Sequence, residues 1–216
     1  IKYYDRKAYL SQSPQFYKQL AQAAGFEKVF LMVPYYRAEQ SFTTRHMTDF
    51  TGWDFEMSFI DSHEDIAKEE ELMLVEGFKA VKEEVLPELE IPTIPFPRLT
   101  MKEAKAKLKK IGIPSEKDGD FSSEEEREIG RLMKEETGHD FVFVTEYGVP
   151  YRAFYHMRPE NDQSVTKSYD LMYKGLEITT GAQREHRPDI LKKQAIEKGV
   201  PAEPLEGYFS YFKYGC

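Results

Sequence analysis

The chain contains one cysteine, Cys216, and no apolar run that approaches ~20 residues. A single cysteine excludes an intrachain disulfide and fits a reducing compartment. The apolar runs are too short for a membrane span, and the N-terminal residues lack a signal-peptide pattern. The five histidines are dispersed, so the sequence predicts no Cys/His metal cluster and no His-based nucleophilic site.

Basic residues are outnumbered, with 30 Lys and Arg against 38 Asp and Glu, which gives a formal net charge of −8. A dedicated nucleic-acid surface needs a net basic face, so this balance argues against one. It leaves room for a local basic pocket. The sequence also shows no internal repeat and no low-complexity tract.

The 216 residues are enough for one substantial core with a small insertion. Hydrophobic residues make up 40% and aromatic residues 14%, which is typical of a globular protein. The chain starts at Ile1 and stops at Tyr214-Gly215-Cys216. Neither end has the character of a natural terminus, so we expect a fragment of a longer protein.

A first helix is predicted between Ser13-Pro14 and Gly25. Serine and proline favour the start of a helix, and glycine favours the position just past its end. Phe16, Leu20 and Ala24 recur at helical spacing. We therefore expect these three side chains to form its buried face.

Three further elements follow in the N-terminal half. Two aromatic-rich runs indicate strands, and a long amphipathic run indicates a helix: Lys28–Arg37, Phe50–Ile60 and Glu64–Leu86. The helix contains the charge run Glu69-Glu70-Glu71. A run of like charges usually lies on a solvated face, so we expect these carboxylates to face water.

The composition changes at Pro87, where prolines punctuate an extended linker. A basic helix is predicted over Lys102–Lys110, followed by a turn rich in Gly, Asp and Ser. Ser123 and Glu126 have the spacing of a capping box for a helix to about Thr137. Residues 87–138 are therefore predicted to be an inserted helical subdomain.

Strands return in the C-terminal half and precede two final helices. The predicted strands are Asp140–Glu146, Tyr151–Met157, Ser168–Tyr173 and Leu176–Thr180, and the helices are Asp189–Lys198 and Glu203–Phe212. The strands come in consecutive runs without regularly alternating helices. This order favours an α+β fold, an antiparallel β-sheet flanked by helices, over a parallel doubly wound sheet.

The most informative segment is the polar loop between the first two strands, Tyr36 to Phe50. Loops held by rigid strands often carry binding sites. Arg37 and Arg45 could clamp phosphates, and Glu39 lies close to the first of them. An ion pair between Arg37 and Glu39 would explain those two residues alone, and it would leave the Thr-Thr-Arg-His run unexplained.

Three other segments carry polar residues in patterns that suit ligands. Gln15 and Lys18 are three apart on the first predicted helix, so an amide and an ammonium could converge, although an isolated lysine more often faces solvent. Asp170 and Glu177 lie on apolar strands, where a cation or a salt bridge would compensate their charge. Gly181 would let the backbone approach a ligand closely, and Arg184, which follows it, could bind a carboxylate through two parallel hydrogen bonds.

In this order, the four segments resemble the class II aminoacyl-tRNA synthetases of the aspartyl/asparaginyl/lysyl subgroup. Gln12-Ser13-Pro14-Gln15-Phe16-Tyr17-Lys18-Gln19 is similar to the "QSPQxYKQ" sequence of aspartyl-tRNA synthetases, and the loop resembles motif 2. The resemblance to the archaeal and eukaryotic aspartyl type covers nearly the whole chain, including residues 87–138. It implies a class II catalytic-domain fold over residues 1–216 and a cytoplasmic enzyme.

The resemblance also implies roles for individual residues. Aspartate would be bound by Gln15, Lys18, Arg37, Thr180 and Arg184. ATP would be bound by Arg37, Glu39, Arg45, His46, Met47, Phe50 and Glu177, with Phe50 stacked on adenine and Arg37 acting on the α-phosphate as the catalytic residue. Mg²⁺ would be held by Asp170 and Glu177. Thr180 and Ala182 stand where many relatives have Ser and Gly, which leaves the pocket shape open.

The implied reaction is formation of aspartyl-adenylate, followed by transfer of aspartate to the acceptor end of tRNA(Asp). The resemblance also implies a homodimer. Motif 1, motif 3 and an anticodon-binding barrel are not found in the sequence, so we expect the fragment alone to be weakly active or inactive. Two alternatives stay open: a tRNA-independent aspartate–ammonia ligase, and a non-catalytic paralogue that binds an amino acid or a protein.

Overall fold

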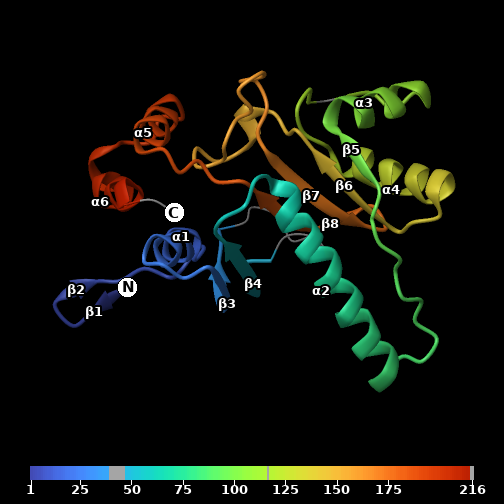
Figure 1. Cartoon of the computed structure of the whole chain (residues 1–216), viewed down its shortest axis with the longest axis horizontal. Coiled ribbons are helices and arrows are strands. Elements are labelled where there is room, and N and C mark those ends of the chain that lie inside the picture. Colours follow the sequence, from blue (N-terminus) through green and yellow to red (C-terminus); the bar gives the residue numbers. More distant parts are fainter. Residues whose placement is uncertain (39–46, 116, 215–216) are drawn as a thin grey trace. The chain divides into compact units, whose positions relative to one another are not determined.

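The computed structural model describes residues 1–38, 47–115 and 117–214, which belong to two compact units. The first unit comprises Ile1–Phe59 and Ala202–Cys216, and the second comprises Ile60–Pro201. Figure 1 labels their elements. Within the described residues, no helix has the length and apolar character needed to cross a lipid bilayer.

The first unit is built around a two-stranded antiparallel ribbon. Its elements are β1 (Lys2–Tyr3), β2 (Arg6–Lys7), α1 (Gln15–Ala23), β3 (Lys28–Tyr36), β4 (Asp49–Met57), the 3-10 turn η2 (Glu203–Leu205), α6 (Glu206–Tyr211) and the 3-10 turn η3 (Phe212–Tyr214). Strands β3 and β4 pair in register from Lys28 with Met57 to Tyr36 with Asp49. Helix α1 packs against both strands and against α6. The two predicted strands are confirmed, whereas β1 and β2 were not predicted.

The buried face of α1 differs from the prediction. Phe16 is 37% exposed and Ala24 is exposed, whereas the buried side chains are Lys18, Gln19 and Gln22. Each buried side chain has a polar partner in the same unit; the Gln19 amide oxygen, for example, accepts from the Tyr208 hydroxyl at 2.9 Å. Polar groups can be buried when they are hydrogen-bonded, and an apolar spacing pattern does not detect such a face.

The second unit is a four-stranded sheet between helices. Its elements are α2 (His63–Glu84), β5 (Arg98–Thr100), α3 (Met101–Lys110), α4 (Ser123–Thr137), β6 (Phe141–Thr145), the 3-10 turn η1 (Val149–Tyr151), β7 (Ser168–Tyr173), β8 (Leu176–Ala182) and α5 (Pro188–Glu197). The strand order is β5-β6-β7-β8. The α+β fold is confirmed, with one addition: β5, inside the predicted linker, pairs parallel with β6.

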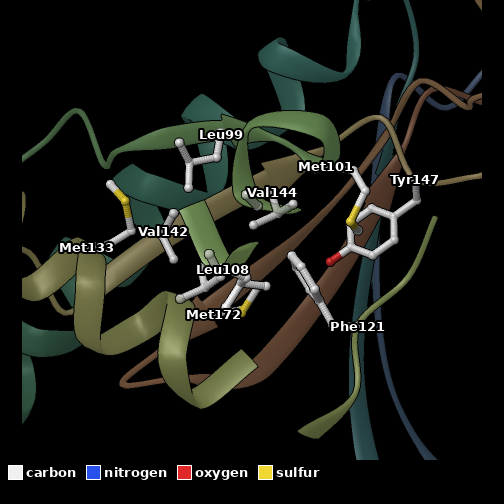
Figure 2. Packing of buried hydrophobic residues seen from close by; sticks show 11 residues of the cluster. Leu99, Met101, Leu108, Phe121, Met133, Val142, Val144, Tyr147 and Met172 are labelled. Carbon is white, nitrogen blue, oxygen red and sulfur yellow. The ribbon is translucent and has the colours of Figure 1, made fainter. Parts of the chain in front are cut away.

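The alternation of side chains along β6 explains how helices cover both faces of this sheet. Phe141 and Phe143 pack with residues of α2, and Val142 and Val144 pack with residues of α3 and α4. Figure 2 shows the cluster between β6 and the helices α3 and α4, in which Leu108 of α3 and Met133 of α4 approach β6. All five residues of β6 are therefore buried.

Residues 87–138 contribute part of this core, because α3 and α4 share one hydrophobic cluster with β6 and β7. Both helices begin with capping boxes, Thr100 with Glu103 and Ser122 with Glu125. The second box was predicted one residue further along, at Ser123 and Glu126. Whether the segment is an insertion stays a prediction.

One predicted strand is wrong. Residues 151–157 form turns after η1, and their only strand-like feature is an isolated antiparallel bridge between His156 and Arg184. The apolar composition of this segment reflects burial of Phe154 and Met157 in a loop. Apolar residues in a short run report burial more reliably than they report strand pairing.

The predicted solvated charge run in α2 is also wrong for two of its three residues. Glu70 and Glu71 are 2% and 3% exposed. The Glu70 carboxylate accepts from the Tyr169 hydroxyl at 2.9 Å and from the Thr179 hydroxyl. Glu71 accepts from the Phe96 amide at 2.7 Å and lies 2.6 Å from the Arg98 guanidinium. Specific partners make burial of these carboxylates tolerable.

Glu70→Gln is expected to change how stability depends on pH. Burial raises the pKa of Glu70, although the hydrogen bonds from Thr179 and Tyr169 act in the opposite direction. Because the folded pKa lies above the unfolded one, the stability that Glu70 contributes is present below about pH 4.3 and is lost as pH rises through the folded pKa. Relative to the variant, the wild type should therefore lose stability with rising pH, by at most about 1.4 kcal/mol per pH unit.

Urea denaturation at a series of pH values would measure this difference. Glu76→Gln, an exposed change on the same helix, is the matched control and should leave the pH profile unchanged. Parallel profiles for the wild type and the Glu70 variant would contradict the expectation.

Helix α4 approaches the β7–β8 turn through two glycines. A Cβ on Gly130 would lie 2.5 Å from the Cα of Gly175, and a Cβ on Gly175 would lie 2.8 Å from the Cα of Arg127. Both obstacles are backbone atoms, which cannot rotate away. The turn also needs a glycine at 175 because φ there is +75°.

Gly130→Ala is expected to lower the free energy of unfolding by about 1–3 kcal/mol, because the added methyl group forces the helix away from the turn. Gly77→Ala is the matched control: Gly77 lies within α2 and nothing lies within 4 Å of an added Cβ. That change should stabilise the protein by roughly 0.5–1 kcal/mol through helix propensity. Thermal or urea denaturation of both variants tests the contrast, which fails if Gly130→Ala is neutral.

Candidate active site

In the first unit, Lys18 lies between two carboxylates of β4. Its ammonium nitrogen is 2.7 Å from Asp54 Oδ1 and 3.1 Å from Glu56 Oε2, and the Lys18 residue is 4% exposed. The solvent-facing alternative for this lysine is therefore wrong. An ammonium has three donors. Two of them point to these carboxylates, so one remains for a further acceptor, and the three side chains together carry one excess negative charge.

Asp54 and Glu56 were not identified as site residues from the sequence. The available signal was two acids at alternate positions of an apolar strand, which places both on one face. That face is the one α1 covers, since Lys18 contacts both acids. Gln15, predicted to act beside Lys18, instead donates from its Nε2 to the Gln19 side chain at 3.1 Å.

At the loop end of the ribbon, Arg37 lies beside two stacked rings. The Tyr35 and Phe50 ring centroids are 5.0 Å apart with an interplanar angle of 11°. The guanidinium carbon of Arg37 lies 5.4 Å and 5.3 Å from these two centroids. Arg37 is exposed, so its donors are accessible to an anionic ligand.

The remaining predicted residues of this loop are only partly described. Met47 is 58% exposed. Glu39, Arg45 and His46 lie outside the described residues, so their predicted roles stay predictions.

In the second unit, Asp170 and Glu177 lie on adjacent strands on the face that α4 covers. Asp170 is paired with Thr180 across β7 and β8, and Glu177 accepts from the Thr180 hydroxyl at 2.9 Å. Burial, followed by the negative charge of Asp170, raises the pKa of Glu177 to about 7. The structure therefore brings together the two carboxylates that the sequence paired.

Arg152 is the cation that accompanies these acids, and the sequence did not predict it. Its Nη2 lies 2.5 Å from Asp170 Oδ2, and its guanidinium carbon lies 3.7 Å from the centroid of the Tyr147 ring. The other Asp170 oxygen, Oδ1, is buried and accepts no hydrogen bond from the described residues. One oxygen of the carboxylate is thus held by the arginine, and the other is buried without a hydrogen-bond partner among the described residues.

Arg184 follows β8 and is half-buried. Its guanidinium carbon lies 5.5 Å from the centroid of Tyr155. Gly181, predicted to let a ligand approach, has a different explanation in the structure: a Cβ there would overlap the ring of Tyr169. Close packing of a core tyrosine accounts for this glycine.

The site residues therefore form two groups, one in each unit. The first unit supplies a buried ammonium between carboxylates and an exposed guanidinium beside aromatic rings. The second unit supplies paired carboxylates with an arginine counter-ion. Such groups suit a zwitterionic amino acid, a phosphate and a hard divalent cation.

A family model described as tRNA synthetases class II (D, K and N) matches residues 1–216. The chain therefore belongs to the class II tRNA synthetase family. The match covers the whole chain, so both units and the segment 87–138 fall within it. This confirms the family inferred from the four sequence segments.

The chain is similar to curated relatives that carry more specific names. It is 43% identical over 222 residues to the aspartate–tRNA(Asp) ligase of Thermoplasma volcanium, covering 100% of this chain and 50% of the relative. It is 39% identical to the cytoplasmic aspartate–tRNA ligase 1 of Dictyostelium discoideum. The chain spans about half the length of the curated relatives it matches.

The fold is also similar to solved synthetase structures. The aspartyl-tRNA synthetase of Entamoeba histolytica superposes with a TM-score of 0.88 at 36% identity and covers 100% of this chain and 46% of its own. These neighbours confirm the predicted class II catalytic-domain fold.

Proposed function

We propose that this chain is the catalytic core of an aspartate–tRNA ligase. It would activate aspartate with ATP to give aspartyl-adenylate and then transfer aspartate to the acceptor end of tRNA(Asp). Membership of the family and the names of the similar ligases support the reaction class. An asparaginyl-tRNA synthetase of Pyrococcus horikoshii, solved with asparaginyl-adenylate, has a TM-score of 0.85 and 31% identity to this chain, which leaves the choice of amino acid to the site itself.

The observation that carries the proposal is the buried Lys18 with one donor remaining. That donor can bond to a carboxylate oxygen of the ligand, and the excess negative charge of the cluster favours a ligand that also carries an ammonium group. Asp54 and Glu56 beside it can accept from the α-ammonium group of the same amino acid. Arg184 would provide a second cation for the aspartate side chain, through two parallel hydrogen bonds.

Arg37 would act on the reacting phosphate. In the first step, an oxygen of the aspartate α-carboxylate attacks the α-phosphorus of ATP, and pyrophosphate leaves with the electrons of the broken P–O bond. Arg37 is exposed and can donate to the negative charge that develops on the phosphate oxygens. Phe50 would stack on adenine, and Glu39, Arg45, His46 and Met47 would complete the nucleotide contacts.

Asp170 and Glu177 fit Mg²⁺. The buried Oδ1 of Asp170 has no hydrogen-bond partner among the described residues, and Glu177 is on the neighbouring strand. Within those residues no cluster of three or more His, Cys, Asp or Glu side chains is placed to hold an ion. Mg²⁺ commonly takes one or two carboxylates and completes its shell with water and phosphate. When bound, it would neutralise phosphate charge.

The whole protein is proposed to be a cytoplasmic homodimer that takes aspartate, ATP and tRNA(Asp) as substrates. Gln15 and Thr180 complete the proposed aspartate contacts.

ATP–pyrophosphate exchange by the full-length protein tests the proposal. Exchange should depend on aspartate, and asparagine should support it at least about a hundredfold less well, because an amide cannot accept two parallel charge-assisted hydrogen bonds from the Arg184 guanidinium. Arg184→Lys should weaken aspartate binding more than ATP binding. Absence of aspartate-dependent exchange would refute the proposal, and ammonia-dependent asparagine synthesis without tRNA would identify an aspartate–ammonia ligase instead.

A further inference from the structure

Tyr35 lies on the same face of the ribbon as the candidate site. Along β3 the residues alternate, so that Phe30 and Met32 are 70% and 67% exposed, whereas Tyr35 is 4% exposed. Tyr35 pairs with Phe50 across the ribbon, and Asp54 lies further along the same face of β4. One tyrosine therefore has neighbours in both parts of the site of this unit.

The hydroxyl of Tyr35 holds the carboxylate that faces Lys18. It donates to Asp54 Oδ2, while Lys18 lies 2.7 Å from Asp54 Oδ1. Each of the two oxygens thus has its own partner, which restricts the rotation of the Asp54 side chain. Asp54 in turn helps to fix the ammonium of Lys18. That ammonium also contacts Glu56 at 3.1 Å, so the two carboxylates together hold it in place.

The ring of Tyr35 supports the residues proposed to bind ATP. It stacks on Phe50 at a centroid distance of 5.0 Å, and the Arg37 guanidinium lies 5.4 Å from its centroid. Gly52, between the two aromatic residues and Asp54, leaves the space that the ring occupies, since a Cβ at this position would overlap it. The position of the Tyr35 ring is therefore defined by the Phe50 ring on which it stacks and by the space that Gly52 leaves open.

We propose that Tyr35 is a positioning residue that couples aspartate binding to ATP binding. The inference rests on the proposed function and extends it to a residue without a ligand contact of its own. The Tyr35 side chain links Phe50, on which ATP would stack, to Asp54, which holds Lys18. A ligand that moves Phe50 would move the Tyr35 ring stacked on it and, through the hydroxyl, the carboxylate beside the aspartate site, so that ATP binding strengthens aspartate binding. The same coupling acts in the reverse direction.

Tyr35→Phe in the full-length protein tests this role, because it keeps the ring and removes only the hydroxyl. The aspartate KM in pyrophosphate exchange should rise by about tenfold, the effect of losing a hydrogen bond to a charged group, while the Kd of ATP measured without aspartate should change by less than about twofold. Tyr36→Phe is the matched control: it removes a phenolic hydroxyl one residue along the strand, on the opposite face. Its aspartate KM and its ATP Kd should equal those of the wild type.

A binding experiment measures the coupling directly. For the wild type, the Kd of aspartate should fall by about fivefold or more in the presence of a non-hydrolysable ATP analogue. In Tyr35→Phe, the analogue should change that Kd by less than about twofold. Thermal unfolding of both variants accompanies the measurement.

The outcomes distinguish a failure of the proposed function from a failure of the inference about Tyr35. If the wild type shows no aspartate-dependent exchange, the proposed function fails. If the wild type is active and Tyr35→Phe keeps both its aspartate KM and the coupling, the inference about Tyr35 is wrong. It is also wrong if Tyr35→Phe weakens the binding of ATP alone as much as that of aspartate and lowers the melting temperature, since that pattern marks a structural role only.

Discussion

Lys18→Met is expected to lower the free energy of unfolding by about 3–5 kcal/mol, since it removes the cation from a buried cluster and leaves its acids uncompensated. Asp54 and Glu56 have side chains that are 19% and 8% exposed, so water cannot replace the lost ammonium effectively. Their mutual repulsion adds to the cost. The variant should also lose aspartate-dependent exchange if the proposed function holds.

Denaturant titration, followed by the fluorescence of the chain's one tryptophan, Trp53 of β4, measures this loss. Lys2→Met is the matched control, because Lys2 is an exposed lysine of the same unit. In the Lys18→Met background, Asp54→Asn with Glu56→Gln should recover part of the stability, because no charge then remains buried without a partner. If Lys18→Met is as stable as Lys2→Met, the ion cluster does not exist in solution.

Arg152→Met is expected to have an effect of similar size in the second unit, again about 3–5 kcal/mol. The side chains of Arg152 and Asp170 are 11% and 7% exposed, and Arg152 is the cation that lies 2.5 Å from Asp170. Without it, Asp170 and Glu177 would be two neighbouring acids that have lost this positive charge. The Arg152 charge also lowers the pKa of Glu177, so its loss should raise that pKa further.

Arg131→Met is the matched control for this change. Arg131 forms ion pairs with Glu128 and Glu135 on the surface of α4, where such pairs contribute little to stability. Asp170→Asn in the Arg152→Met background should restore stability towards that of the wild type, which urea denaturation would measure. Equal stability of the Arg152 and Arg131 variants would rule out a buried ion pair at Asp170.

Sequence patterns predicted the elements well where burial follows apolar periodicity. Strands β3, β4, β6, β7 and β8 and the helices α2, α3, α4 and α5 lie within a few residues of their predicted bounds. The same patterns failed where buried groups are polar. The inner face of α1 consists of Lys18, Gln19 and Gln22, and its burial depends on partners that are distant in sequence.

The candidate site was predictable to the extent that it resembles a known family. That resemblance supplied Lys18, Arg37, Asp170 and Glu177 without any geometry. Their partners could not be inferred, because each pairing joins distant segments. Arg152, for example, lies 18 residues from Asp170 in a segment whose composition had suggested a strand.

The central position of β6 has a consequence for hydrogen exchange. The strand is paired with β5 on one side and β7 on the other, and its five residues are buried between two helical layers. Its amide protons can therefore exchange with deuterium only when the whole unit opens, so their protection reports the global free energy of that unit. A loss of 3–5 kcal/mol in Arg152→Met would accelerate this exchange by roughly a hundredfold to several thousandfold.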